Sequence, residues 1–517
     1  MIRGQLSGVT FIIHLLMAAI GLTALPQLVL ASKLDRIVTH GGPMIEWVIR
    51  NDGVRGNPFD IVATVTFTHR DSGEQRRTEM FFAGGDQWKF RFTAVRPGVW
   101  TFVSRSDHRQ LNGKQGVITV NESEGTGGPV RLFITNNGNR WAWSGDGRPF
   151  VPRIVMYRDP DGFHQQPDRI DDDLKLWFGE HGFNGLHTAV LCRWFNFDKV
   201  SSDEIAGDDP NPDPRTFEAL ELLIGKAYAA GGFVHMWAWG DESRRMTPTR
   251  WGINGKADRR LQRYIAARLG PMPGWTMGYG FDLWEWVNEP QLVDWHNHLI
   301  ERMFHPHLVG GRVHQHGRPL DTEMTRRLSY VGYEAHRPDY ATYVRALQRN
   351  PNMPVMMEDR FRVRDSKTYR EKDYTEAMTR RGMWHAAMAG GVGNIWGYLL
   401  PDAGPHGMSR PYPNRSQLRT HALFFDRRFT ADLAPVAGLT DGLCMATADR
   451  TRLIFYKEDG EQLQMALSSM PGERRAVAVD ALKPYDEIDL GALKATDQTW
   501  TAPYRSDWAV SVDETKP

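Results

Sequence analysis

The chain has 517 residues, with 63 Lys and Arg against 62 Asp and Glu, so its formal net charge is only +1. This length exceeds what one hydrophobic core supports and predicts two or three domains. The charge balance lacks the basic excess typical of nucleic-acid-binding proteins. The two cysteines, Cys192 and Cys444, fall in segments of different character and exclude a disulfide framework.

Residues 1–31 have the pattern of a secretory signal peptide. A positively charged start precedes a mostly apolar stretch, 9–30, and Val29-Leu30-Ala31 then offers small or aliphatic residues where a signal peptidase cleaves. The alternative is an uncleaved membrane anchor, because the stretch approaches the length of a membrane span. His14, Pro26 and Gln27 interrupt it and favour the signal peptide. We therefore expect export to the periplasm or the cell exterior, with no stable membrane insertion after cleavage.

Residues 33–125 alternate apolar and polar side chains with period two, as in 63–68 and 88–92. Such alternation indicates strands with one buried face, and glycine-containing turns separate them. The spacing predicts an N-terminal β-sandwich. At the other end of the chain, residues 435–517 return to β-type patterns and predict a small C-terminal β domain.

Between these segments, residues 132–433 alternate strand-like and helix-like patterns. The expected strands number eight: 150–157, 182–191, 233–239, 281–287, 308–313, 328–334, 354–357 and 393–398. Eight such units predict an α/β fold, the (β/α)8 TIM barrel. A doubly wound open sheet is the competitor, but the glycine-rich phosphate turn expected after its first strand is missing from the sequence.

Active sites of these barrels lie at the carboxyl ends of the strands, and glycoside hydrolysis needs two carboxylates there. The predicted fourth strand, 281–287, runs into Asn288-Glu289-Pro290. Alone, this tripeptide indicates a turn with an exposed glutamate. At this position it resembles the clan of retaining glycosidases on (β/α)8 barrels, in which an Asn-Glu pair ends strand four. The resemblance implies that Glu289 is the acid/base and that Asn288 contacts the sugar 2-hydroxyl.

The same clan places its nucleophile at the end of strand seven. Three strands beyond the Asn-Glu pair, the apolar segment 354–357 ends in Glu358, which the resemblance makes the nucleophile. One alternative is a structural Glu358 paired with Arg360 or Arg362. The other is Asp359 as the nucleophile, although strand alternation predicts that its side chain points away from the barrel mouth.

Further substrate-binding candidates come from other strand ends. In the clan, strand eight often carries a tryptophan platform for sugars. Tyr333 ends the predicted strand six, where a tyrosine is in a position to hydrogen-bond the nucleophile. The candidates are Trp396, Tyr333, His235, Trp237, Trp239 and Arg153, and packing is the alternative role for each. Glu285 is expected to be structural, paired with Arg153.

Six histidines follow the predicted fourth strand: His296, His298, His305, His307, His314 and His316. A metal site is one interpretation, but the spacing of helical zinc ligands is missing, so polar loops are favoured. We expect no metal and no other cofactor.

The segment 66–100 resembles the sandwich domain that precedes barrels in uncharacterised bacterial glycosidases similar to apiosidase-like and cellulase-like enzymes. The resemblance implies a retaining glycoside hydrolase of a polysaccharide or oligosaccharide. The alternatives are an inverting hydrolase and a non-catalytic carbohydrate-binding protein on the same fold. The sugar-gripping residues of strands one and two are not matched; Arg153, Tyr157, Arg158 and Arg193 occur there, and such arginines suit an acidic sugar.

Overall fold

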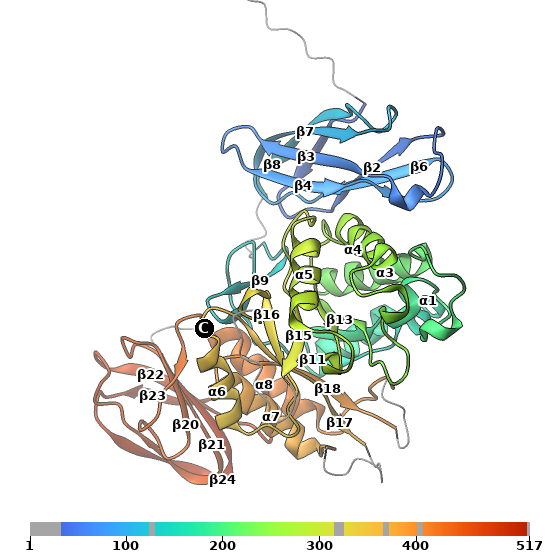
Figure 1. Cartoon of the computed structure of the whole chain (residues 1–517). Helices are drawn as coiled ribbons and strands as arrows, with labels where there is room; N and C mark the ends of the chain where they lie inside the picture. Colours follow the sequence, from blue (N-terminus) through green and yellow to red (C-terminus); the bar gives the residue numbers. More distant parts are fainter. Residues whose placement is uncertain (1–32, 124–129, 315–324, 365–371, 401–406, 514–517) are drawn as a thin grey trace, which may run out of the picture.

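A computed structural model describes residues 33–123, 130–314, 325–364, 372–400 and 407–513 (Figure 1). The predicted signal peptide lies outside these residues, so export remains a prediction. Within the described part of the chain, no helix is long and apolar enough to cross a membrane.

The N-terminal domain consists of two sheets that face each other across an aromatic core. In the core, Trp47 stacks on Phe90 at 4.8 Å and contacts Phe67 and Phe102 of the other sheet. The five-stranded sheet has the order β1-β8-β7-β3-β4 and the three-stranded sheet the order β2-β6-β5. The strands are β1 (Arg36–Thr39), β2 (Ile45–Arg50), β3 (Ala63–His69), β4 (Gln75–Glu79), β5 (Phe81–Phe82), β6 (Gln87–Phe92), β7 (Gly98–Ser106) and β8 (Gln115–Asn121).

A phenylalanine of the barrel completes the core of this N-terminal domain. Phe304 follows the barrel helix α5 (Glu289–Ile300) and is only 1% exposed. Its ring packs edge-on against Phe67 at 5.8 Å and Phe92 at 5.5 Å. Ion pairs also join the two parts: Arg91 of β6 binds Glu221, and Glu79 of β4 binds Arg263, both partners lying on barrel helices. The domain is therefore docked on the barrel by an inserted ring and by ion pairs.

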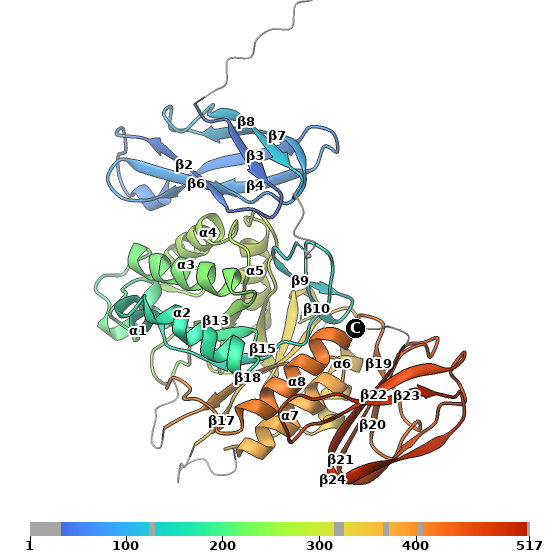
Figure 2. The same cartoon turned by 180° about the vertical axis from the view of Figure 1, so that it is seen from behind.

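The middle of the chain forms a closed parallel barrel, which confirms the predicted fold class (Figures 1 and 2). Its strands are β11 (Ile154–Met156), β12 (Gly185–Ala189), β13 (Phe233–Trp239), β14 (Trp275–Gly280), β15 (Val309–His314), β16 (Tyr330–Tyr333), β17 (Val355–Val363) and β18 (Gly393–Tyr398). With α5, the surrounding helices are α1 (Pro160–Gln165), α2 (Arg169–Leu174), α3 (Pro214–Ala229), α4 (Lys256–Arg268), α6 (Tyr340–Arg349), α7 (Glu376–Met388) and α8 (Arg415–Arg428). The hairpin β9 (Ile134–Asn137) and β10 (Arg140–Trp143) leads into the barrel, where Trp141 Nε1 donates to the Val355 carbonyl at the start of β17.

The predicted fourth strand, 281–287, is wrong. The strand is β14, which ends at Gly280, and the chain then turns at Asp282, whose backbone is left-handed with φ of 52°. Residues Leu283–Glu285 form a short 3-10 helix rather than a strand. The apolar run after Gly280 therefore resembles a strand only in composition. The true strand contains two glycines, which weaken strand patterns.

The chain ends in a six-stranded sheet that packs against α7 and α8. Trp384 of α7 stacks on Tyr456 of this sheet with ring centroids 4.8 Å apart. The strands have the order β19-β20-β21-β24-β22-β23. They are β19 (Ala434–Pro435), β20 (Leu443–Ala446), β21 (Leu453–Met465), β22 (Arg474–Asp480), β23 (Ile488–Leu493) and β24 (Gln498–Asp513).

Candidate active site

A cavity of about 460 Å³ opens at the carboxyl ends of the barrel strands. This is the end at which barrel enzymes carry their active sites. We call it the mouth cavity. Its lining is Trp237, Asp241, Ser243, Arg244, Phe281, Asp282, Arg312, Glu334, His336, Asp359, Arg360, Arg362, Arg364 and Lys372.

Asp282, just beyond β14, is the carboxylate that strand four brings to the mouth cavity. Its left-handed backbone is uncommon for a residue other than glycine, and such conformations cluster at functional sites. Its Oδ1 contacts Arg312 Nη2 from β15. Burial raises the pKa of Asp282; the Arg312 charge opposes this, and the charges of Glu334 and other nearby carboxylates add to it. The environment therefore favours the protonated form of Asp282 more than water does.

Asp359, in β17, is the carboxylate that strand seven brings to the same cavity. Its Oδ2 lies 3.3 Å from His336 Nε2, and its Oδ1 lies 3.9 Å from Arg312 Nη1. Burial alone would raise the pKa of Asp359. The hydrogen bond from His336 and the charges of Arg312 and Arg362 outweigh burial and lower it to about 2. Asp359 is therefore ionised at neutral pH.

Glu334 follows β16 and completes a group with His336 and Asp359. Its Oε1 lies 3.4 Å from His336 Nε2, and its Oε2 lies 3.6 Å from Arg312 Nη2. The possible ligand atoms of these three residues all lie within 4.8 Å of one another, an arrangement that resembles a cation site. Arg312 and a protonated His336 already supply positive charge to the group, so these side chains neutralise one another.

His336 should titrate well above an ordinary histidine. Hydrogen bonds with Asp359 and Glu334 raise its pKa to about 9. Because the folded-state pKa lies above the unfolded value, the stability gained from this charge is complete below about pH 6.5 and is lost as pH rises through about 9. We expect histidine-selective NMR to show a resonance that titrates near pH 9 and is missing in His336→Gln. In Asp359→Asn the same resonance should titrate lower; an unchanged pKa there would contradict the proposed pairing.

Glu358 lies inside the barrel, below the mouth cavity. Its side chain is 0% exposed and is not among the residues that line the cavity. Its Oε1 accepts hydrogen bonds from Trp237 Nε1 at 2.9 Å and from the Tyr330 hydroxyl at 2.8 Å, and His235 Nε2 lies 3.5 Å away. The expected tyrosine partner from strand six is thus Tyr330 and not Tyr333.

Two glycines make room for the Glu358 carboxyl. A Cβ atom on Gly278 would lie 1.8 Å from Glu358 Oε1, and one on Gly332 would lie 2.2 Å from Oε2. Every real side chain at these positions would displace the carboxyl. The sequence therefore reserves this enclosed space for Glu358.

Asn288 and Glu289 begin helix α5 and do not end a strand. The Asn288 side chain accepts from the Gln291 backbone N–H, and the Gln291 side chain accepts from the Asn288 N–H, which forms a capping box. Glu289 is the first helical residue and is half-buried outside the lining of the mouth cavity. The expected strand-end position of this pair is therefore wrong, while their roles in substrate binding and catalysis stay predictions.

Of the other substrate-binding candidates, Trp237 lines the mouth cavity and His235 is buried beside Glu358. Trp396 packs between Phe361 and α7, where a Cβ on Gly382 would lie 2.7 Å from its ring. The remaining aromatic candidates also lie outside the cavity lining. The Tyr333 hydroxyl accepts from Asn350 Nδ2, and Trp239 is buried against Phe195.

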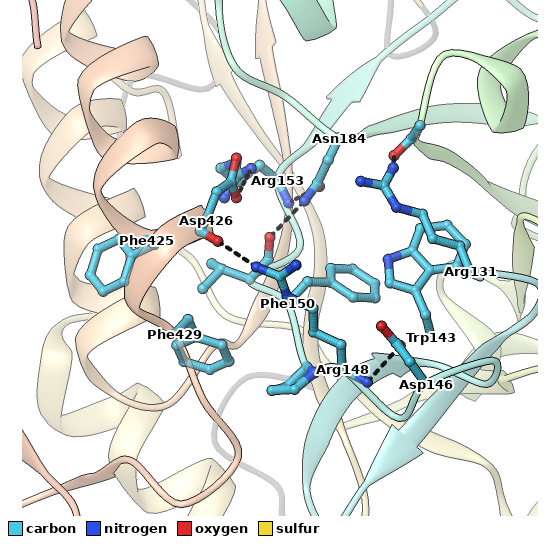
Figure 3. Close-up of a pocket in the computed structure, with 13 residues that line it drawn as sticks. Arg131, Trp143, Asp146, Arg148, Phe150, Arg153, Asn184, Phe425, Asp426 and Phe429 are labelled. Atoms are coloured by element: carbon cyan, nitrogen blue, oxygen red, sulfur yellow. Dashed lines mark hydrogen bonds and ion pairs between the residues drawn. The ribbon is translucent and has the colours of Figure 1, made fainter. Parts of the chain in front are cut away.

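Arg153 lies at the opposite, amino-terminal end of the barrel. It precedes β11 and lines a separate cavity, where its Nη2 donates to Asp426 Oδ1 of α8 at 2.7 Å (Figure 3). This end of such barrels contributes stability. Glu285, expected to pair with Arg153, instead accepts the backbone N–H groups of Glu242 and Ser243.

The histidines after strand four are mostly packing residues. His307 stacks on Trp275 at 3.9 Å, and His305 stacks on Phe133 at 4.1 Å. Burial lowers the pKa of His307 to about 4 and that of His305 to about 2, so both are neutral near pH 7. His296 Nε2 lies 2.8 Å from the Ser329 hydroxyl. His316 lies outside the described residues.

Comparison with known proteins shows the fold of glycoside hydrolases. A Bacteroides vulgatus ATCC 8482 protein described provisionally as a glycoside hydrolase is 15% identical, with a TM-score of 0.71 over 93% of this chain and 100% of that one. A glycoside hydrolase family 5 structure from the same organism is 15% identical, with a TM-score of 0.55 over 74% of this chain and 93% of that one. The family model described as "Domain of unknown function (DUF5060)" matches residues 44–107. No curated protein matches the sequence.

Proposed function

We propose that this chain hydrolyses glycosidic bonds at the mouth cavity, with Asp282 as acid/base and Asp359 as nucleophile. One observation carries the proposal. Carboxylates from strands four and seven share this cavity and one arginine, Arg312, while their environments shift their pKa values in opposite directions. Opposite shifts of this kind separate an acid from a nucleophile. The two strands are those on which the resembling clan carries its catalytic pair.

The proposed course is a double displacement. Asp359 attacks the anomeric carbon as Asp282 gives its proton to the departing glycosidic oxygen, which leaves a glycosyl ester on Asp359. Asp282 then takes a proton from water, whose oxygen attacks the anomeric carbon and releases Asp359. Arg312, which contacts both carboxylates, orients them. NMR of the first product formed should show the anomer of the substrate, whereas the opposite anomer would indicate an inverting enzyme.

Glu289 and Glu358 form the alternative catalytic pair that the sequence predicts. Glu358 has the expected strand and a tyrosine partner, but its carboxyl is enclosed. A nucleophile must reach the anomeric carbon, and the accessible carboxylate next to it is Asp359, which lines the cavity. Accessibility therefore favours Asp359.

Removing Asp282 tests the acid. Asp282→Asn cannot donate the proton, so hydrolysis of natural glycans should slow by about 10²–10⁴-fold. Aryl glycosides with good leaving groups need little protonation, so their first step should slow far less. A screen of defined polysaccharides followed by steady-state kinetics on both substrate types measures this difference. If Asp282→Asn slowed both substrate types equally, Asp282 would not be the acid. If Glu289→Gln slowed natural glycans much more than activated aryl glycosides, the acid would be Glu289.

A further inference from the structure

Three arginines stand at alternate positions where β17 ends: Arg360 and Arg362 lie in the strand, and Arg364 follows its last residue, Val363. All three line the mouth cavity, as alternation along a strand predicts for residues on one face. Between them, Phe361 and Val363 are buried, and Phe361 packs on Trp396 at 5.2 Å. The chain therefore presents a row of arginines to the cavity, at backbone positions about 7 Å apart. We call these three residues the arginine row.

The mouth cavity is more positive than the chain as a whole. Of the fourteen described residues that line it, six are Arg or Lys and four are Asp or Glu, whereas the whole chain has 63 and 62. Asp241 binds Arg244, and the other three carboxylates share Arg312 and His336. Within the row, Arg364 binds Asp373. The described lining of the cavity therefore carries a positive excess, to which Arg360 and Arg362 contribute.

Arg360 is a buried cation whose guanidinium stacks on the cavity wall. It is 6% exposed and lies 4.6 Å from the centroid of the Trp237 ring. Its Nη2 lies 3.1 Å from His187 Nε2. Burial, together with the charges of Arg362 and Arg244, lowers the pKa of Arg360 to about 9, although Asp159 and Asp359 act to raise it. An anion bound at this point would offset the repulsion among these cations.

We propose that the mouth cavity binds an anionic sugar, carrying a carboxylate or a sulfate ester, with Arg360 and Arg362 as its anchors. Guanidinium groups bind such planar or multidentate oxyanions through paired hydrogen bonds. The proposal rests on the proposed function only in taking the ligand to be a saccharide. The sequence suggested an acidic sugar from other arginines. The structure assigns those to different contacts, because Arg158 binds Asp173 and Arg193 binds Asp161.

The test compares charged and neutral ligands on the Asp282→Asn variant, with the wild type as reference. Calorimetry would use oligomers of galacturonic, glucuronic and mannuronic acid, sulfated galactose oligomers, and the matching neutral oligomers of galactose, glucose and mannose. At least one anionic oligomer should bind more tightly than the matching neutral oligomer, by about 10-fold or more. This preference should weaken as sodium chloride is raised from about 0.05 to about 0.5 M. Comparing the uronic acid oligomers with the sulfated oligomers shows whether the cavity binds a carboxylate or a sulfate ester.

Arg362→Gln should weaken the anionic ligand by about 10- to 100-fold and leave a neutral one unchanged. The matched control is Arg50→Gln, on the exposed edge of the N-terminal domain, which should change neither. Equal binding of anionic and neutral oligomers, or no effect of Arg362→Gln, overturns the proposal. If the wild type hydrolysed neutral glycans and no anionic ones, the anionic-sugar proposal would be overturned and the proposed function would stand. Tight, Arg362-dependent binding of an acidic oligomer without hydrolysis by the wild type would overturn the proposed function instead.

Discussion

Asp359→Asn is expected to reduce hydrolysis by about 10⁴-fold or more while the chain keeps its fold. The amide is a poor nucleophile, so the first displacement fails. The fold should survive because the Asp359 side chain is partly exposed at the cavity and contributes little packing. In this variant His336, the partner of Asp359, can become neutral by losing a proton. Steady-state kinetics on the substrate found by screening gives the loss, and circular dichroism with thermal melting checks the fold.

Two further variants make this result specific. Asp294→Asn changes an exposed carboxylate on α5 that binds Arg259 and should leave turnover unchanged. Glu358→Gln keeps the shape of the enclosed carboxyl and should retain much more activity than Asp359→Asn. If Glu358→Gln abolishes turnover and Asp359→Asn does not, the nucleophile is Glu358. A fluorosugar trapped on the wild-type enzyme and mapped by peptide mass spectrometry gives an independent assignment.

Gly278→Ala is expected to have the largest effect on stability, a loss of about 3 kcal/mol or more. The new methyl group would lie 1.8 Å from Glu358 Oε1 and 2.9 Å from the Tyr330 hydroxyl. Neither atom has free space to move into, because Glu358 and Tyr330 are both 0% exposed. The carboxyl would be forced from the donors Trp237 and Tyr330 and left buried without them. Thermal melting and denaturant midpoints measure the loss.

The matched control is Gly225→Ala in the middle of α3, where a Cβ meets nothing within 4 Å. Alanine favours a helix over glycine there, so this variant should be stabilised by up to about 1 kcal/mol. Glu358→Ala removes the atoms that the new methyl group would meet. In that background, Gly278→Ala should therefore cost much less than it does in the wild type. Equal cost in both backgrounds would show that Glu358 is not the source of the strain.

The sequence predicted the barrel because the alternation of strand-like and helix-like patterns extends along 132–433, and this prediction does not depend on the exact bounds of single elements. It failed at strand four, where glycines in β14 weaken the strand pattern and the apolar run 281–287 mimics one. Asn288-Glu289-Pro290 was thereby placed at a strand end, although it caps a helix. Asp282 lies within the predicted strand 281–287, but its left-handed turn depends on the surrounding fold.

For strand seven, the sequence identified the right segment and ranked its two carboxylates by simple alternation. The pairing of β17 with β18 shifts between Met357 and Arg360, so Glu358 and Asp359 lie in a bulge. A bulge re-aims side chains, which is why alternation excluded Asp359 and the structure places it in the mouth cavity. Arg312 and His336 had no sequence signal, since their importance arises from neighbours distant in the chain. The spacing of the arginine row was visible in the sequence, but the cavity it faces was not.

The ring of Phe304 has a consequence for motion. It belongs to the barrel yet fills the core of the N-terminal domain between Phe67 and Phe92. A side chain enclosed in another domain can leave only when that core opens, because protein interiors are close-packed. Rotation of the N-terminal domain about a hinge would require this opening. The insertion of Phe304 therefore opposes rotation of the N-terminal domain relative to the barrel.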